Sequence, residues 1–599
     1  MKKVLWVFIT FMTVMSMILV SCKSETTPTS NEGPTVIEGT VNNPLPETTK
    51  PVIQPSTEKP KYGGIATVSL SANINGFDEA FISPVGVYTL KLTNQELLMG
   101  DWTKGPAGTN EANFVHGGIN AMDLKTGCLA DSWEIPSRGK MIFHIREGVY
   151  WHNKAPTNGR ELTVDDVVFS IKRMCTEPGA YIKMSFPTLA KTLVVTGDEA
   201  TRMVTVECPL EEWITALSQV PDFLTIMPRD AIEKFGHMND WQNSIGTGPF
   251  MLTDFVSNGS ATFKSNPNYW EKNPIGPGKG DQLPYIDGVK LLIITDASTR
   301  LAGFRTGKID SAGGEYDDVK EFLTDPEIKS MSYSSDSCYL IAMRTDKANL
   351  PFSKKEVRQA LFLATDFNKI KDQYFSGRAL ILNWPIAYTK EYAAAYVPME
   401  KLPANVQELY SHNVTKAKEL LTKAGYPTGF ETTIITYNTP AFVDYLSLIK
   451  EMWAEAGITL KIDAREYAVW VSRLRARNYD ELFYFYSSAA WQRLLNFNGS
   501  SFYNMSYVND SHVAEVYTQM NEYAGVDEAM QAKIHAELMP YVLEQCWVLH
   551  TPSAHLYVVW WPWRKNWIGE LYIGYYNDFV YNKYIWLDTE LKQEMTGRK

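Results

Sequence analysis

The chain has 599 residues, several times the size of one ordinary domain, so it must fold around at least two hydrophobic cores. Hydrophobic residues make up 45 % and charged residues 21 %, a balance that excludes a disordered chain and a protein built mainly of membrane spans. The formal net charge of -11 opposes binding to phosphate backbones and excludes nucleic acid as an expected partner.

The first predicted element is an export signal. Lys2 and Lys3 precede an apolar run at 4–20, which is the layout of a signal peptide rather than of a membrane-spanning helix. The run ends in Leu-Val-Ser-Cys, which resembles the bacterial lipobox with Cys22 as the lipidated residue. We therefore expect residues 1–21 to be a lipoprotein signal peptide and the body to lie outside the cytoplasm. An uncleaved anchor is the alternative, and it leaves the body on the same side.

Residues 22–61 are predicted to be a disordered tether. Thr, Pro, Ser, Glu and Asn dominate this stretch, and it contains no aromatic residue. Such a composition cannot bury enough surface to offset the loss of chain entropy on folding. The expected arrangement is a globular body held near a membrane by a flexible leash.

The five cysteines of the body are few, widely spaced and odd in number. They therefore form neither a disulfide framework nor a CxxC metal site. The sequence does not decide whether individual disulfide pairs form, such as Cys175 with Cys208.

Strands and helices alternate along the body. A strand is expected at 65–71, and a helix is expected to begin at Thr163, whose hydroxyl can cap the amide of Asp166. A second helix is expected to begin with a capping box of Ser353 and Glu356. The later predicted elements are helices at 413–424, 442–456 and 470–477 and strands at 458–462 and 482–486. This alternation predicts an α/β lobe.

Short motifs in a fixed order carry a family resemblance. They are YGG at 62–64, LADSWE at 129–134, FHIREGVYWH at 143–152, LTVDDVVFSIKR at 162–173, GTGPF at 246–250, NPNYW at 266–270, PYID at 284–287, GKID at 307–310 and AGYP at 424–427. Each one alone could be turn chemistry. Together they resemble the dipeptide-, oligopeptide- and nickel-binding family of bacterial extracellular solute-binding proteins, called family 5, over about residues 62–568.

The resemblance implies a two-lobed α/β periplasmic-binding-protein fold of the Venus-flytrap type, type II. Lobe I is expected at 62–330 with an extra subdomain at about 103–221, lobe II at 331–545, and a return to lobe I at 546–599. The resemblance also implies a monomeric receptor that encloses a peptide or similar organic solute and hands it to the permease and ATPase of an ABC importer.

Candidate ligand contacts follow from the same resemblance. In peptide-binding relatives an acid after the strand matching 482–486 meets the ligand's amino group, because a buried ammonium needs an opposite charge. Here residues 487–492 contain no acid, so a simple peptide ligand is in question and an oligosaccharide is the alternative. The predicted ligand-binding residues are Ser83, Val85, Trp384, Tyr467, Tyr486, Trp491 and Arg493. Each aromatic residue among them could instead be core packing, and Arg493 a surface charge.

Catalytic motifs are missing from the sequence. It contains no GxSxG, HExxH, Walker or EF-hand pattern, and His550 and His555 are five residues apart in a predicted strand and loop. We expect no enzyme activity, cofactor or metal. A sensory or structural surface lipoprotein of the same fold, and a hydrolase, are the other functions considered.

Overall fold

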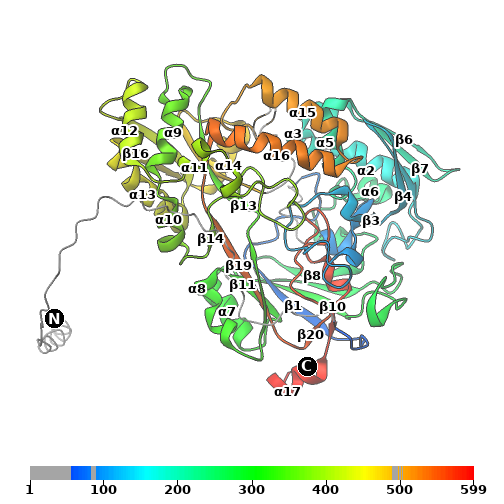
Figure 1. Ribbon diagram of the computed structural model, residues 1–599. Coiled ribbons are helices and arrows are strands. Elements are labelled where there is room, and N and C mark those ends of the chain that lie inside the picture. The colour runs from blue at the N-terminus through cyan, green and yellow to red at the C-terminus, as the bar shows by residue number, and fades with distance from the viewer. Residues whose placement is uncertain (1–55, 82–89, 489–496, 498–500, 502, 599) are drawn as a thin grey trace, which may run out of the picture. The chain divides into compact units, whose positions relative to one another are not determined.

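The strand predicted at 65–71 begins a mixed sheet of four strands (Figure 1). The computed structural model describes residues 56–81, 90–488, 497, 501 and 503–598. Ala66, Val68 and Leu70 are buried and alternate with more exposed residues, as the period of a strand requires. The strand order is β1-β10-β9-β8, with β1 parallel to β10 and the other pairs antiparallel. The bounds are Ile65–Leu70 (β1), Phe250–Val256 (β8), Ser260–Ser265 (β9) and Gly288–Ile293 (β10).

An antiparallel sheet of order β4-β5-β7-β6 lies within the segment predicted as an inserted subdomain. Its strands are Ala130–Ser137 (β4), Lys140–Ile145 (β5), Val194–Asp198 (β6) and Met203–Glu207 (β7). Helix α2, Val164–Thr176, packs against it. The Asp166 N–H donates to the Thr163 hydroxyl at 3.2 Å, and the Thr163 N–H donates to the Asp166 carboxylate at 3.1 Å. This reciprocal capping confirms the predicted helix start.

The second half of the chain builds a five-stranded sheet of order β16-β15-β17-β13-β18. Strand β15 is parallel to β16 and β17, whereas β13 is antiparallel to β17 and β18. The strands are Ser337–Met343 (β13), Phe430–Tyr437 (β15), Ile458–Arg465 (β16), Leu482–Ser488 (β17) and Val548–His550 (β18). The connecting helices are Val414–Lys423 (α12), Pro440–Glu455 (α13) and Tyr467–Ala476 (α14). The predicted alternation of helix and strand is confirmed here.

One predicted helix start is wrong. Helix α9 spans Lys355–Ala364, and Lys354 precedes it without a side-chain cap. The Ser353 hydroxyl donates instead to the carbonyl of Leu350 at 2.8 Å, because Pro351–Ser353 forms a separate 3-10 turn. The expected capping box of Ser353 and Glu356 therefore does not form.

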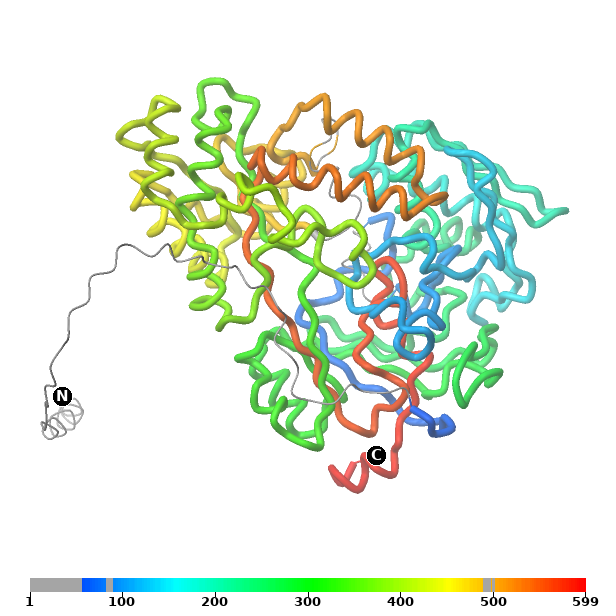
Figure 2. The backbone as a smooth tube through the Cα atoms, in the orientation of Figure 1, coloured from blue at the N-terminus to red at the C-terminus, as the bar shows by residue number. Residues whose placement is uncertain are grey.

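The chain crosses between two sheets at two points. Strands β11, β19 and β12 form a sheet in that order, and β14 also pairs with β19. They span Ser311–Gly314 (β11), Lys329–Ser334 (β12), Ala379–Leu380 (β14) and Ser553–Trp560 (β19). Only two residues separate β12 from β13, and two separate β18 from β19, although each pair is divided between this sheet and the five-stranded one. Figure 2 shows the carboxyl-terminal segment running back along these strands. The predicted lobe boundaries at 330/331 and 545/546 remain a proposal. The two crossings lie a few residues after them in the sequence.

One hydrophobic core joins the first sheet to the end of the chain. It combines β1, β8, β9 and β10 with apolar residues between 558 and 587, and the rings of Trp102 and Tyr584 stack there at 4.6 Å. The carboxyl-terminal segment therefore packs with the amino-terminal strands.

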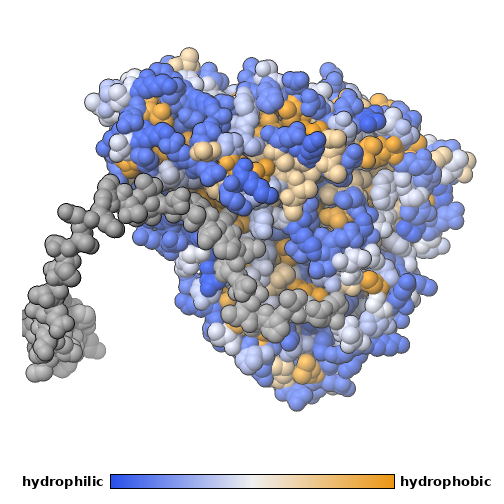
Figure 3. Space-filling model, in the orientation of Figure 1, coloured by the Kyte–Doolittle hydropathy of each residue, from blue (hydrophilic) through white to orange (hydrophobic). Residues whose placement is uncertain are grey.

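The remaining described elements complete the layers. The strands are Leu98–Gly100 (β2), Lys125–Gly127 (β3), Arg564–Lys565 (β20) and Trp586–Leu587 (β21). The helices are Leu90–Thr93 (α1), Tyr181–Ser185 (α3), Pro187–Thr192 (α4), Trp213–Gln219 (α5), Arg229–Phe235 (α6), Ala297–Arg305 (α7), Tyr316–Thr324 (α8), Phe367–Lys369 (α10), Ala404–Glu408 (α11), Ser511–Tyr523 (α15), Glu528–Gln545 (α16) and Thr589–Thr596 (α17). Hydrophilic residues cover most of the face seen in Figure 3. Within the described ranges, no helix has the length and apolar character needed to cross a membrane.

Candidate ligand-binding site

Five aromatic side chains gather at one edge of the five-stranded sheet. The parallel strands β15 and β17 both run toward this edge, and in open α/β sheets ligands bind outside the carboxyl ends of the strands. We call the cluster the aromatic platform and define it as Tyr339, Tyr437, Phe442, Tyr467 and Tyr486. Tyr339, Tyr467 and Tyr486 are 37 %, 50 % and 54 % exposed, which is unusual for three neighbouring large rings.

A buried indole supports the platform from below. Trp470 is 2 % exposed, and its N–H donates to the carbonyl of Tyr484 at 3.1 Å. The rings of Tyr467 and Tyr486 lie nearly parallel to it, with centroids at 6.0 and 6.4 Å. Trp470 therefore fixes the orientation of two exposed rings while leaving area on each of them open.

Strand pairing brings the third exposed ring into the same cluster. Tyr339 of β13 lies opposite Tyr486 of β17 in the antiparallel ladder, and their ring centroids are 6.4 Å apart. Residues directly opposite each other on antiparallel strands project from the same face. Phe442 packs edge-on against Tyr339 at 5.0 Å and against Tyr437 at 6.0 Å. These contacts join helix α13 and three strands in one surface.

Two tyrosines of the platform have raised pKa values. Burial raises the pKa of Tyr486, and the neighbouring Tyr467 raises it further. Burial also raises the pKa of Tyr339, followed by the effects of Tyr486, Tyr374 and the carboxylate of Glu315. Glu315 precedes helix α8, so it brings an acid from the neighbouring sheet within electrostatic reach of the platform. The arrangement suits flat or ring-shaped groups that stack and accept hydrogen bonds from phenols.

The predicted site residues have different outcomes. Tyr467 and Tyr486 lie together on the platform. Trp384 is 2 % exposed and its ring packs against Phe497 at 6.0 Å, so it presents no face to a ligand in this conformation. Four predicted contacts, together with the lipidation residue, lie outside the described residues: Ser83, Val85, Trp491, Arg493 and Cys22.

Sequence reasoning missed Tyr339, Tyr437, Phe442 and Glu315. Tyr437 and Phe442 flank the turn between β15 and α13, so the carboxyl-edge rule applied to the predicted strand would have indicated them. Tyr339 and Glu315 had no such signal, because their places depend on which sheet each crossing segment joins.

The histidines and cysteines have structural surroundings. The ring of His152 lies 3.2 Å from the carbonyl of Gly248 and accepts from the Gly246 N–H at 3.1 Å, and burial lowers its pKa to about 4. His550 lies 2.8 Å from the Tyr410 hydroxyl. The five described cysteines are all free thiols, so the Cys175–Cys208 pair does not form in this structure. In the described parts of the chain, no three His, Cys, Asp or Glu side chains cluster as a metal site.

The profile of the bacterial extracellular solute-binding proteins, family 5 (Middle), matches residues 126–511. The chain belongs to this family. The family 5 chain also has the fold of a two-lobed periplasmic binding protein, as predicted. Helicobacter pylori DppA in complex with the peptide STSA gives a TM-score of 0.66 at 20 % identity over 86 % of this chain and 98 % of that one.

The relatives found by sequence match a smaller share of the chain than the structures of the same fold do. Heme-binding protein A of Haemophilus influenzae is 28 % identical over 371 residues, covering 58 % of this chain and 63 % of the relative. The dipeptide-binding protein of Escherichia coli K12 is 27 % identical over 371 residues, covering 58 % of this chain and 64 % of the relative. The chain thus spans less than two thirds of these relatives' own lengths. AgaA from Agrobacterium tumefaciens R10, solved with agropinic acid, shares the fold with a TM-score of 0.66 and 20 % identity over 88 % of this chain and 99 % of that one.

Proposed function

We propose that this family 5 protein is the solute-binding component of an ABC importer. It captures a peptide or a similar small organic solute between two lobes and delivers the solute to a membrane permease without chemical change. The aromatic platform carries this proposal, because three exposed tyrosines, two of them stacked on one buried indole, form a surface for a ligand rather than a core. The set proposed to bind ligand is Ser83, Val85, Tyr467, Tyr486, Trp491 and Arg493, joined by Tyr339.

The names of the relatives favour peptides as the ligand class. They include di/tripeptide-, dipeptide- and glutathione-binding proteins, beside a heme-binding protein. The neutral tyrosine faces favour an oligosaccharide as the second candidate, because sugar rings stack on aromatic faces and their hydroxyls pair with phenols. A surface lipoprotein without a permease would use the same fold and differs only in its partners.

Small molecules released from the purified protein test the ligand class. We expect mass spectrometry after denaturation to find one class of organic solute, and we expect that solute to raise the melting temperature of the stripped protein. Binding to the native state alone adds about 2.7 kcal/mol of stability at a hundredfold excess over Kd. Failure of the recovered solute, a peptide panel and an oligosaccharide panel to shift the melting temperature would count against a receptor.

Attachment to the membrane forms a second part of the proposal. We propose that lipid on Cys22 anchors the protein outside the cytoplasm and that residues 22–61 act as a tether. Cys22→Ala should release the protein into the soluble fraction, whereas Ser24→Ala, two residues further along, should not. A Cys22→Ala protein that stays with the membrane would argue for an uncleaved anchor.

A further inference from the structure

One loop of the first core continues into contacts with the second lobe. We call residues 110–122 the strap. Ala112, Phe114 and Ala121 of the strap are buried in the core that contains the first sheet. Two of its carbonyl oxygens are bound on the same side: Phe114 accepts from the N–H groups of Leu571 and Tyr572 at 2.7 and 2.9 Å, and Gly117 accepts from the Tyr576 N–H at 2.9 Å. The strap is therefore fixed to the lobe formed by the two ends of the chain.

The amides of Asn110 and Ala112 donate to the carbonyls of Gly105 and Lys104, but other amide groups of the strap are bound to side chains from elsewhere. Four of its backbone N–H groups donate to side-chain oxygens of four residues beyond position 335. These pairs are Asn113 to Glu391 at 2.6 Å, Gly118 to Asp336 at 3.2 Å, Asn120 to the Tyr392 hydroxyl at 3.2 Å and Met122 to Glu528 at 3.4 Å. Three of the four acceptors are carboxylates, and hydrogen bonds to charged groups are about twice as strong as neutral ones.

The four acceptors belong with the five-stranded sheet. Asp336 directly precedes β13, the fourth strand of that sheet. Glu528 is the first residue of α16, which packs against α9 and α11. The segment that holds Glu391 and Tyr392 continues to Val397, whose N–H lies 3.4 Å from the sulfur of Met539 in α16. The strap thus bonds to both lobes: the Phe114 and Gly117 carbonyls to the first lobe, and four amide groups and the Asn110 carbonyl to the second.

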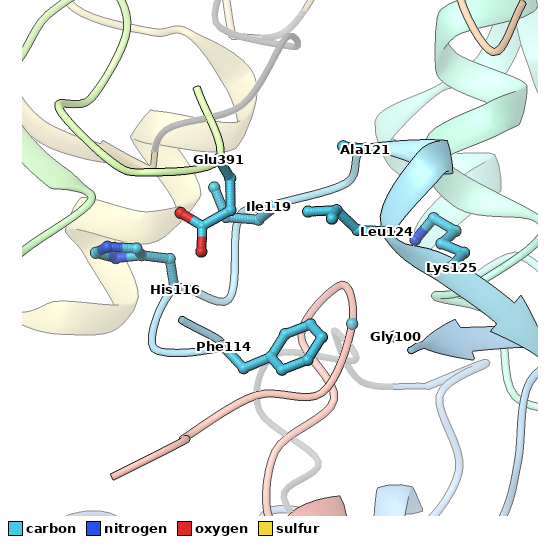
Figure 4. A pocket seen from close by; sticks show the side chains of 9 residues that line it. Gly100, Phe114, His116, Ile119, Ala121, Leu124, Lys125 and Glu391 are labelled. Atoms are coloured by element: carbon cyan, nitrogen blue, oxygen red, sulfur yellow. The ribbon is translucent and has the colours of Figure 1, made fainter. Parts of the chain in front are cut away.

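Two small cavities flank the strap. One of about 10 Å³ is lined by Phe114, His116, Ile119 and Glu391, and Figure 4 shows the Glu391 carboxylate reaching in from the segment opposite the strap. The other, of about 20 Å³, is lined by Asn120 and Glu528 among others. Each has room for about one water molecule. The second oxygen of each glutamate is buried there without a partner among the described residues, as are His116 Nδ1 and Asn120 Oδ1.

We propose that the strap is an interlobe latch that holds the lobes together in the absence of ligand. Each of its contacts joins groups of the protein alone, so the latch needs no solute to form. Ligand entry then requires these hydrogen bonds to open, and the affinity of a solute is reduced by the population of the latched state. The inference depends on the two-lobed fold and on no particular ligand.

Hydrogen exchange on stripped, ligand-free protein tests the latch. In the wild type we expect the amides of Asn113 and Asn120 to exchange at least about tenfold more slowly than in Glu391→Ala/Tyr392→Phe, because that double variant removes both acceptors. Small-angle scattering should show a larger radius of gyration for the double variant. Glu391→Gln is the matched control, since its amide oxygen still accepts from Asn113 and should preserve the protection.

Two results would overturn the latch. One is fast exchange of the strap amides in the ligand-free wild type. The other is unchanged exchange and radius of gyration in the double variant, with β8 and β9 still protected as proof that it folds. Helix α5 also contacts the second lobe, where the Trp213 N–H donates to the Ala524 carbonyl at 2.9 Å. If the radius of gyration of the double variant is unchanged, the lobes are held together by the Trp213–Ala524 contact and not by the strap.

Discussion

The aromatic platform and the strap interface are built in opposite ways. On the platform, Tyr339, Tyr467 and Tyr486 are partly exposed; the buried ring of Trp470 supports Tyr467 and Tyr486, and Phe442 packs against Tyr339. At the strap, four backbone amides are paired with three carboxylates and one tyrosine hydroxyl, and most residues of the strap are buried. Exposed ring faces on the platform are available to bind a solute, whereas the paired polar groups of the strap hold two parts of the same chain together. The predictions below test this division, beginning with the largest expected effect.

Removing the indole under the platform should be the most damaging change. Trp470→Ala deletes a buried ring that contacts Tyr467, Tyr486 and Phe483, so we expect a loss of about 3–5 kcal/mol in the free energy of unfolding. Chemical denaturation followed by tyrosine and tryptophan fluorescence measures it. Trp470→Phe should lose less, because part of the ring stack remains. Equal losses in both variants would mean that the indole N–H bond to Tyr484, and not stacking, supports the platform.

An exposed platform ring should matter for binding more than for folding. Tyr486→Ala should weaken binding of the recovered solute by about 2 kcal/mol, the scale of an aromatic anchor, with a smaller change in stability because the side chain is half exposed. Calorimetry measures the affinity. Tyr150→Ala is the control, since Tyr150 is similarly exposed at 43 % but lies between β5 and α2 and is not part of the platform. An affinity unchanged by Tyr486→Ala, or lowered equally by Tyr150→Ala, would remove the platform from the site.

The strap should respond to pH through Glu528. The pKa of this carboxyl is raised to about 7. Burial is the largest cause and Asp123 adds to the rise, whereas the N–H groups of Met122 and Gly525 and the charge of Lys125 act to lower it. The folded protein holds this proton more tightly than the unfolded chain does. The group's contribution to the free energy of unfolding is therefore complete below the ordinary pKa of 4.5 and is lost as pH rises toward 7.

Glu528→Gln should abolish that loss. We expect the variant to gain about 1–2 kcal/mol over the wild type between pH 5 and 8, measured as slower exchange of the Met122 amide and a higher melting temperature. Glu522→Gln is the control, because Glu522 is an exposed acid on the preceding helix. A difference between wild type and Glu528→Gln that does not vary with pH would show that Glu528 stays ionised throughout.

Local periodicity and capping were readable from the sequence, but long-range pairing was not. Thr163 caps the amide of Asp166, as predicted, because both groups act within one helical turn. The box at Ser353 fails because Pro351 closes a separate turn just before the helix. The fold followed from ordered motifs and the alternation of strand and helix.

The site was predicted only in part, since Tyr467 and Tyr486 adjoin strands with clear patterns. Tyr339 lies just after a crossing between sheets, Glu315 lies between β11 and α8, and the strap's acceptors come from positions more than 200 residues away. Such pairings are set by tertiary packing, which leaves no periodic trace in the sequence.

The smallest expected effect concerns the one acid identified beside the platform. Burial raises the pKa of Glu315, as do Asp318 and Asp317, yet its side chain is exposed to solvent, so its charge acts weakly on a bound solute. Glu315→Gln should weaken a cationic solute by about 0.5–1 kcal/mol and leave a neutral one unchanged, with the difference shrinking at high salt. Calorimetry at two ionic strengths measures this, and Glu327→Gln, an exposed acid beyond the far end of α8, serves as the control. Equal losses for cationic and neutral solutes would mean that Glu315 acts by holding helix α8 in place, because its N–H also binds the Asp318 carboxylate at 3.2 Å. A loss confined to cations would instead make Glu315 the charge that selects ligands on an otherwise neutral surface.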